Sequence, residues 1–88
     1  MKIKYGFVLR EVAGSYVVIP VGENAADFNG VISLNEVGAF LWGKLVEDID
    51  ESALLAALLA EYEVDEDTAK TDIAAFLSKV KEHGMLEG

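Results

Sequence analysis

The chain has 88 residues, 52% of them apolar, with no cysteine, one histidine and a formal net charge of −9. Its length fits a single domain over residues 1–88, and the lack of cysteine excludes disulfides, thiolate zinc sites and a cysteine nucleophile. No apolar run approaches the roughly 18 residues of a membrane-spanning helix and no signal-peptide core is visible, which favours a soluble cytoplasmic protein.

Two strands are predicted near the start of the chain. Tyr5–Val12 and Tyr16–Ile19 are rich in β-branched and aromatic residues, and the turn residues Ala13-Gly14-Ser15 join them as a hairpin. Pro20 has no N–H to donate to a sheet. We therefore expect it at the end of the second strand or at an unpaired position.

A third strand is predicted at Gly30–Leu34, after a polar loop over Gly22–Asp27. Its Ile32 and Leu34 share one face, because side chains alternate along a strand. If this strand lies at a sheet edge, its unpaired N–H and C=O groups offer a template for an incoming peptide strand. The alternative is that its own loop protects the edge.

Three helices are predicted in the rest of the chain. Asn35 and Asp50 are good N-cap residues for the first two, and the acids at 65–67 suit the positive N-terminus of the third, which Gly84 is expected to end. Strands followed by helices indicate an α+β fold of three strands and three helices, in a winged helix-turn-helix-like arrangement. The expected buried stripes are Val37, Phe40, Leu41 and Leu45, then Leu54, Leu55, Leu58, Leu59 and Tyr62, then Ala69, Ile73, Phe76, Leu77 and Val80.

The sequence offers little for catalysis. The acids at 61–67 lack the spacing of a calcium loop and are interpreted as a solvated helix end. His83 stands alone beside a helix stop, where it would interact with the helix dipole, and no serine has a second histidine to activate it. The glycines form no phosphate-binding fingerprint. We therefore expect no enzyme activity, no metal and no cofactor.

The charge is distributed unevenly, and this bears on the partner. Residues 1–46 sum to zero, whereas residues 47–88 carry twelve acids against three lysines. Such a surface repels phosphates and anionic membranes. A winged-helix DNA-binding module is an alternative, but a third helix that begins Asp65-Glu66-Asp67 is unsuited to it. We expect a protein or peptide partner, no nucleic acid and no membrane, with a winged-helix protein-interaction module as a further alternative.

Several short motifs occur in the same order as in a known protein family. The chain resembles the PqqD family, small proteins of pyrroloquinoline quinone biosynthesis, and the related RiPP recognition elements. Val37 replaces the usual threonine of the first motif, and Val80 replaces a later leucine. The motifs, which cover nearly the whole chain, are Leu34-Asn35-Glu36-Val37-Gly38 with Leu41-Trp42, Glu61-Tyr62, Asp72-Ile73-Ala74-Ala75-Phe76-Leu77 and Gly84-Met85-Leu86.

The resemblance implies a three-stranded antiparallel sheet followed by three helices, in agreement with the α+β prediction. It also implies a non-catalytic adaptor that binds the leader segment of a ribosomally synthesised precursor peptide. The leader would add as a strand to the third strand, pack against the third helix and be presented to a modifying enzyme, often a radical S-adenosylmethionine maturase. Iron–sulfur chemistry would belong to that enzyme, because this chain has no cysteine. The exposed edge also allows self-pairing into a homodimer.

The expected peptide-binding residues come from two elements. Helix residues 72, 76 and 79 form a stripe beside the core stripe of the third helix, because residues three and four apart are neighbours. Phe76 is expected mainly in the core with one edge lining a groove, and Trp42 at the rim of the core. The full set is Asn29, Gly30, Val31, Ile32, Ser33 and Leu34 on the strand, with Asp72, Phe76 and Lys79 on the helix.

Overall fold

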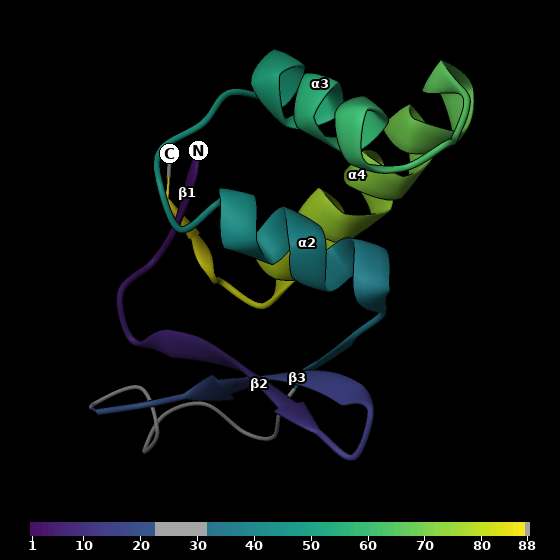
Figure 1. The fold of residues 1–88 in the computed structure, drawn as a ribbon. Coiled ribbons are helices and arrows are strands. Elements are labelled where there is room, and N and C mark those ends of the chain that lie inside the picture. The colour runs from purple at the N-terminus through teal and green to yellow at the C-terminus, as the bar shows by residue number, and fades with distance from the viewer. Residues whose placement is uncertain (23–31, 88) are drawn as a thin grey trace.

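The predicted strands precede the helices, as the sequence predicts, and a short strand, β5 (Leu86–Glu87), follows the last helix (Figure 1). The computed structural model describes residues 1–22 and 32–87. The three helices lie together on one side of a three-stranded antiparallel sheet, which makes the fold α+β. The elements are β1 Lys2–Ile3, β2 Phe7–Val12, β3 Ser15–Pro20, β4 Ile32–Leu34, α2 Glu36–Lys44, α3 Glu51–Glu61, α4 Glu66–Glu82 and β5 Leu86–Glu87.

The β2–β3 hairpin closes through the predicted turn. Ala13 and Gly14 both have positive φ, 53° and 81°, as a two-residue type I′ turn requires. The flanking residues Val12 and Ser15 are paired, and at the other end of the hairpin the Val21 N–H donates to the Gly6 carbonyl at 2.9 Å. Hydrogen-bonded and non-bonded pairs alternate along such a ladder, so this geometry fixes which backbone groups of β3 face β2.

Each helix begins at a capping side chain. The side chains of Asn35, Asp50 and Asp65 accept hydrogen bonds from the backbone N–H groups three residues ahead, each at 2.7 Å. The bond from the Thr68 N–H lowers the pKa of Asp65 below its ordinary value, because it favours the charged carboxylate. At the other end of α4, Gly84 has a φ of 69°, which confirms the predicted helix stop.

The core lies between the sheet and the helices. Val18, Ile32 and Leu34 contribute the sheet side, and Leu41, Leu45, Leu54, Leu58, Ala69, Ile73, Phe76, Leu77, Val80 and Met85 the helical side. The prediction for Trp42 is wrong: only 3% of it is exposed, so it belongs to the core and not to its rim. Trp42 also lines the floor of a hollow beside β1, and burial of so large an aromatic side chain is favourable.

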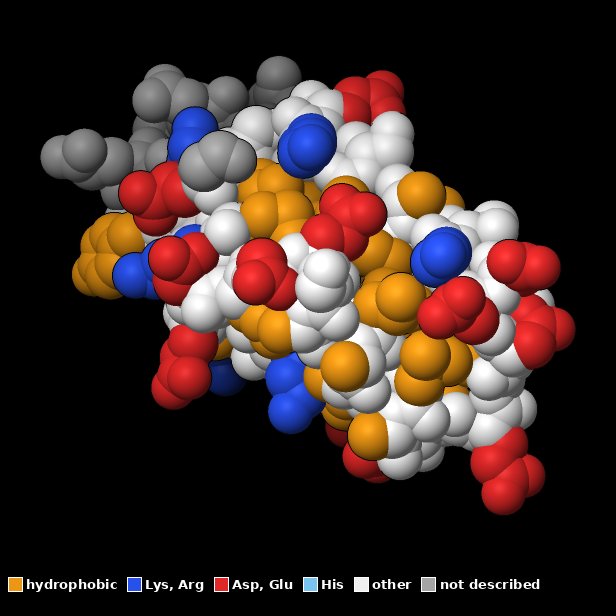
Figure 2. Space-filling model, turned by 90° about the horizontal axis from the view of Figure 1, so that it is seen from above, with side chains coloured by type: hydrophobic (Ala, Val, Ile, Leu, Met, Phe, Trp, Pro, Cys, Tyr) orange, Lys and Arg blue, Asp and Glu red, His pale blue; other side chains and the backbone are white. Residues whose placement is uncertain are grey.

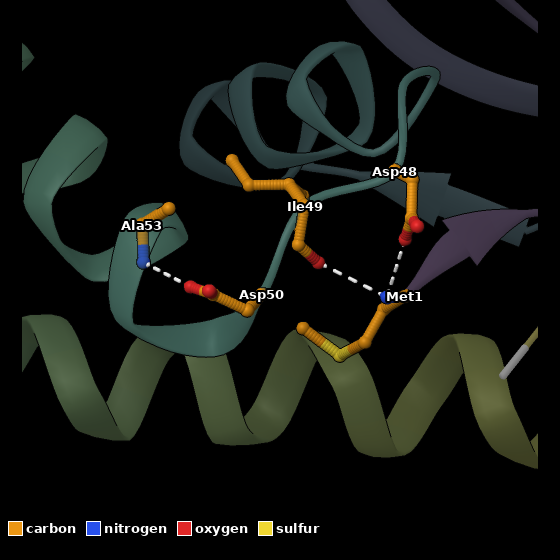
Figure 3. A network of polar contacts seen from close by, with 5 residues as sticks. All are labelled: Met1, Asp48, Ile49, Asp50 and Ala53. Carbon is orange, nitrogen blue, oxygen red and sulfur yellow. Dashed lines mark hydrogen bonds and ion pairs between the residues drawn. The ribbon is translucent and has the colours of Figure 1, made fainter.

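A second, two-stranded sheet joins the ends of the described chain and is absent from the sequence-based prediction. Lys2 pairs with Glu87 and Ile3 with Leu86. The Met1 amino group donates to the Asp48 carboxylate at 2.9 Å and to the Ile49 carbonyl at 3.1 Å, beside the Asp50 cap of α3 (Figure 3). This ammonium group lowers the pKa of Asp48. The contacts hold β1 against the connection between α2 and α3.

The remaining boundaries differ slightly from the prediction. Tyr5 and Gly6 form a turn before β2, so that strand is shorter than the predicted Tyr5–Val12. Pro20 ends β3, as expected. Only Ile32–Leu34 of the predicted third strand is described, and it is a strand. Among residues 1–22 and 32–87, no helix is long and apolar enough to cross a membrane.

Candidate functional site

A hollow of about 200 Å³ lies between β4, α2 and α4, and we call it the β4–α4 groove. It brings together the predicted residues Leu34, Asp72, Phe76 and Lys79, which are up to 45 positions apart in the chain. Asn29, Gly30 and Val31 lie outside the described residues. The groove is lined by Leu34, Asn35, Val37, Gly38, Leu41, Asp72, Ala75, Phe76 and Lys79.

The strand that borders the groove is at the edge of its sheet. The order β2-β3-β4 leaves β4 paired on one side only, among the described residues. The ladder alternation directs the backbone groups of Tyr16 and Val18 towards β4, where their partners are Leu34 and Ile32. Ser33 lies between these two, so its N–H and C=O point away from β3. They face the open edge beside the groove.

The side chains of β4 alternate as predicted. Ile32 and Leu34 are buried, with 5% and 8% exposed, whereas Ser33 is exposed. The buried pair therefore anchors the strand to the core and offers a ligand mainly its backbone. Because a ladder residue presents both polar backbone groups to one side, Ser33 supplies a donor and an acceptor at the same point of the edge.

Helix α4 forms the opposite wall of the groove. Phe76 is 5% exposed and also lines the groove. This agrees with the prediction that it lies mainly in the core with one edge in a groove. Asp72 is half-buried, and Lys79 is exposed. The Lys79 Nζ donates to the Ser33 carbonyl oxygen at 2.6 Å, across the open edge of β4. The groove thus has an apolar floor with a carboxylate and an ammonium group on one wall.

Helix α2 closes the groove because of a glycine. A Cβ atom on Gly38 would lie 3.2 Å from the Leu34 Cβ and 3.3 Å from the Asn35 Oδ1, closer than nearly all real contacts of this kind. The residue is buried, and the helix passes close over the end of β4 at this point. Gly38 therefore sets the spacing between α2 and β4.

The sequence-based set of site residues missed the contribution of α2. Asn35, Val37, Gly38 and Leu41 line the groove, as does Ala75 of α4. A glycine inside a helical pattern is a signal of close packing and could have identified Gly38. The other α2 residues look like ordinary helix positions, and only the packing of α2 on β4 reveals that they reach the groove.

The rest of the described surface carries further hollows, one histidine contact and scattered acidic side chains. Two other hollows, of about 360 and 390 Å³, lie beside β1 and between α3 and α4. No three acidic or histidine side chains among residues 1–22 and 32–87 come together as a metal site would require. His83 makes a 2.8 Å contact through Nδ1 with the Lys79 carbonyl at the end of α4. Acidic side chains are scattered over the helical face, with apolar side chains between them (Figure 2).

Comparison with known proteins gives one family and two structures. The family described as coenzyme PQQ synthesis protein D (PqqD) matches residues 15–86. The structure of TbiB1 in complex with the TbiA(beta) leader peptide is 27% identical, with a TM-score of 0.76 over 100% of this chain and 96% of that one. The lasso peptide synthetase B1 complexed with its leader peptide is 23% identical, with a TM-score of 0.73 over 99% and 96%. No curated protein sequence matches the chain.

Proposed function

The chain belongs to the PqqD family, and we propose that it is a non-catalytic adaptor that binds the leader segment of a ribosomally synthesised precursor peptide. TbiB1, which has the same fold over nearly its whole length, is known in complex with a leader peptide. By analogy, this chain would bind a leader peptide and would catalyse no reaction step itself. No residue grouping described above would serve as a catalytic centre.

The observation that carries the proposal is the open edge of β4 beside an apolar groove. A peptide that adds as a strand gains backbone hydrogen bonds that do not depend on its sequence, while side-chain pockets provide selectivity. Ser33 offers the N–H and C=O that such a strand needs, and the groove lies next to them. We propose that Asn29, Gly30 and Val31, which precede β4 in the chain, also contact the leader.

The size of the groove indicates what the leader inserts. Its volume of about 200 Å³ exceeds that of an engineered protein cavity of about 150 Å³ that binds benzene. One aromatic or large aliphatic side chain therefore fits over the floor that Phe76, Leu34 and Leu41 form. Full burial of such a side chain contributes about 1.5–3 kcal/mol, and the hollow, which is open to solvent on one side, provides part of this in addition to the backbone bonds of the docked strand.

The adaptor would present the bound leader to a peptide-modifying enzyme, for which a radical S-adenosylmethionine maturase is the proposed class. The chain has no cysteine, so an iron–sulfur cluster would be held by that enzyme. Because the precursor is made on ribosomes, we propose that the two meet in the cytoplasm. A homodimer formed through β4 would use the same edge as the leader, so peptide binding and such self-pairing would exclude each other.

Calorimetric titration with the leader of a short precursor peptide encoded beside this gene tests the proposal. We expect saturable binding of one leader per chain. The core segment of the same precursor, without its leader, serves as the matched control and should not bind. Failure of every neighbouring precursor leader to bind the folded protein would contradict the proposed function.

A further inference from the structure

One cation occupies the edge that the leader would use. The Lys79 Nζ lies 2.6 Å from the Ser33 carbonyl oxygen, and this is the carbonyl that faces away from β3. Among the described residues, Lys79 forms no ion pair with a carboxylate, whereas Lys70 on the same helix lies 3.6 Å from Glu66. The ammonium group of Lys79 is therefore held by a neutral acceptor at the mouth of the groove.

Strand addition changes the surroundings of this ammonium group. An added strand donates an N–H to the Ser33 carbonyl, so the Lys79 side chain loses the acceptor that it holds in the unbound protein. Its stem still lies along the groove wall, which keeps the charge close to the docked peptide. A carboxylate on the peptide is the group that best replaces the lost acceptor, because a charge-assisted hydrogen bond is stronger than a neutral one.

We propose that Lys79 selects leaders that carry an aspartate or glutamate beside the side chain inserted in the groove. This inference rests on the proposed function and specifies its peptide. On binding, the Lys79 ammonium group exchanges the Ser33 carbonyl for the carboxylate of the leader. The residue therefore acts as a specificity determinant that also covers the open edge of β4 while no peptide is bound, as lysines do on other edge strands.

The opposite charge on the same wall gives the leader a direction. Asp72 lies seven residues before Lys79 on α4, which is about 10.5 Å along the helix axis. A leader docked in one direction places its carboxylate at Lys79, whereas the reversed strand places it near Asp72, where like charges repel. The net charge of −9 disfavours acidic peptides at long range, but exposed charges more than about 8 Å away are largely screened at physiological salt.

A selection from random peptides tests this inference and does not require the sequence of the natural leader. A displayed library of 12-residue peptides is selected against the wild-type protein, Lys79→Glu and Lys81→Glu. Lys81 is the matched control, because it undergoes the same charge change near the same end of α4 but does not line the groove. We expect Asp or Glu at a fixed distance from a large apolar residue in the peptides selected by the wild type and Lys81→Glu. Peptides selected by Lys79→Glu should lose this preference.

A double-mutant cycle with one selected peptide then measures the contact. Replacing the peptide's acidic residue by its amide, or Lys79 by methionine, should each weaken binding about two- to fivefold, as expected for an exposed ion pair. The two changes together should weaken binding no further than either alone. Circular dichroism confirms that each variant is folded.

The outcomes separate the inference from the function on which it rests. Peptides that bind the wild type but show the same composition after Lys79→Glu would overturn the role of Lys79 and leave peptide binding intact. Additive effects in the cycle would overturn it in the same way. If the folded wild-type protein selects no peptide and binds no precursor leader, the proposed function fails and the inference falls with it.

Discussion

The substitution Ser33→Pro should weaken peptide binding at the edge of β4 while it leaves the protein folded. Proline lacks the N–H group, and the Ser33 N–H faces the open edge instead of β3. Proline is tolerated on edge strands where the missing N–H faces away from the sheet. The adjacent substitution Leu34→Pro is the matched comparison, because the Leu34 backbone groups face Tyr16 of β3.

The expected effects on stability differ clearly. An 88-residue domain has an unfolding free energy of about 4–13 kcal/mol. Ser33→Pro should reduce it by about 1 kcal/mol, because proline strains φ but removes no ladder hydrogen bond. Leu34→Pro leaves a carbonyl of β3 without its donor, which costs about 1–3 kcal/mol, and changes the shape of a buried side chain, which costs about 1–3 kcal/mol more. The second variant should therefore lose about 2–6 kcal/mol, clearly more than Ser33→Pro.

The effect of Ser33→Pro on leader binding should be large. A peptide carbonyl that docks opposite residue 33 finds no donor, at a cost of about 1–3 kcal/mol or roughly 5- to 150-fold in affinity. Urea denaturation followed by circular dichroism gives the stability, and calorimetric titration of a cognate leader gives the affinity. Ser33→Ala, which keeps the N–H, should bind normally. Wild-type affinity in folded Ser33→Pro would refute docking at β4, and destabilisation as severe as that of Leu34→Pro would refute the backbone assignment.

Four further results are expected. Phe76→Ala should lower the unfolding free energy by about 3–5 kcal/mol in urea denaturation, because its side chain is buried; a loss below about 1 kcal/mol would contradict this. Asp72→Ala should leave the urea midpoint nearly unchanged but shift the calorimetric affinity for the leader by about 1 kcal/mol; an unchanged affinity would remove it from the site. The folded-state pKa values of Asp48 and Asp65 lie below the ordinary 3.8, so the stabilisation they provide is complete at neutral pH. It should be lost as the pH falls below about 4, and denaturation curves that do not change between about pH 7 and pH 3 would exclude this. Fluorescence anisotropy should detect no binding of duplex DNA at micromolar protein and physiological salt, because twelve acids oppose three lysines in residues 47–88; salt-sensitive binding would contradict the charge argument.

Local chemistry explains why much of the fold could be predicted from the sequence. A capping side chain bonds to a backbone N–H only three residues away, so Asn35, Asp50 and Asp65 mark the helix starts without reference to the rest of the molecule. The same holds for the Ala13-Gly14 turn, where both residues must adopt positive φ. Period-two and helical spacing of apolar residues then assign the strands, the helices and most of the core.

Contacts between distant segments were beyond such reasoning. The pairing of β1 with β5 joins residues more than 80 positions apart through strands of two residues each, which are too short to carry a periodic signal. Trp42 was misplaced because helical spacing says which side of α2 it occupies but not how many elements cover that side.

The candidate site likewise combines features that local sequence patterns predict with features that depend on contacts between distant segments. Periodicity within single elements predicted which residues of β4 share a face and that residues 72, 76 and 79 form a stripe on α4, whereas the resemblance to the PqqD family implied that the two elements form one surface. It took the packed molecule to show that Val37 and Leu41 of α2 reach the groove, that the backbone of Ser33 faces the open edge, and that Lys79 reaches its carbonyl at 2.6 Å. These depend on the register of β4 against β3 and on the packing of two helices against that strand. Such distances are set by the whole core, and no local pattern encodes them.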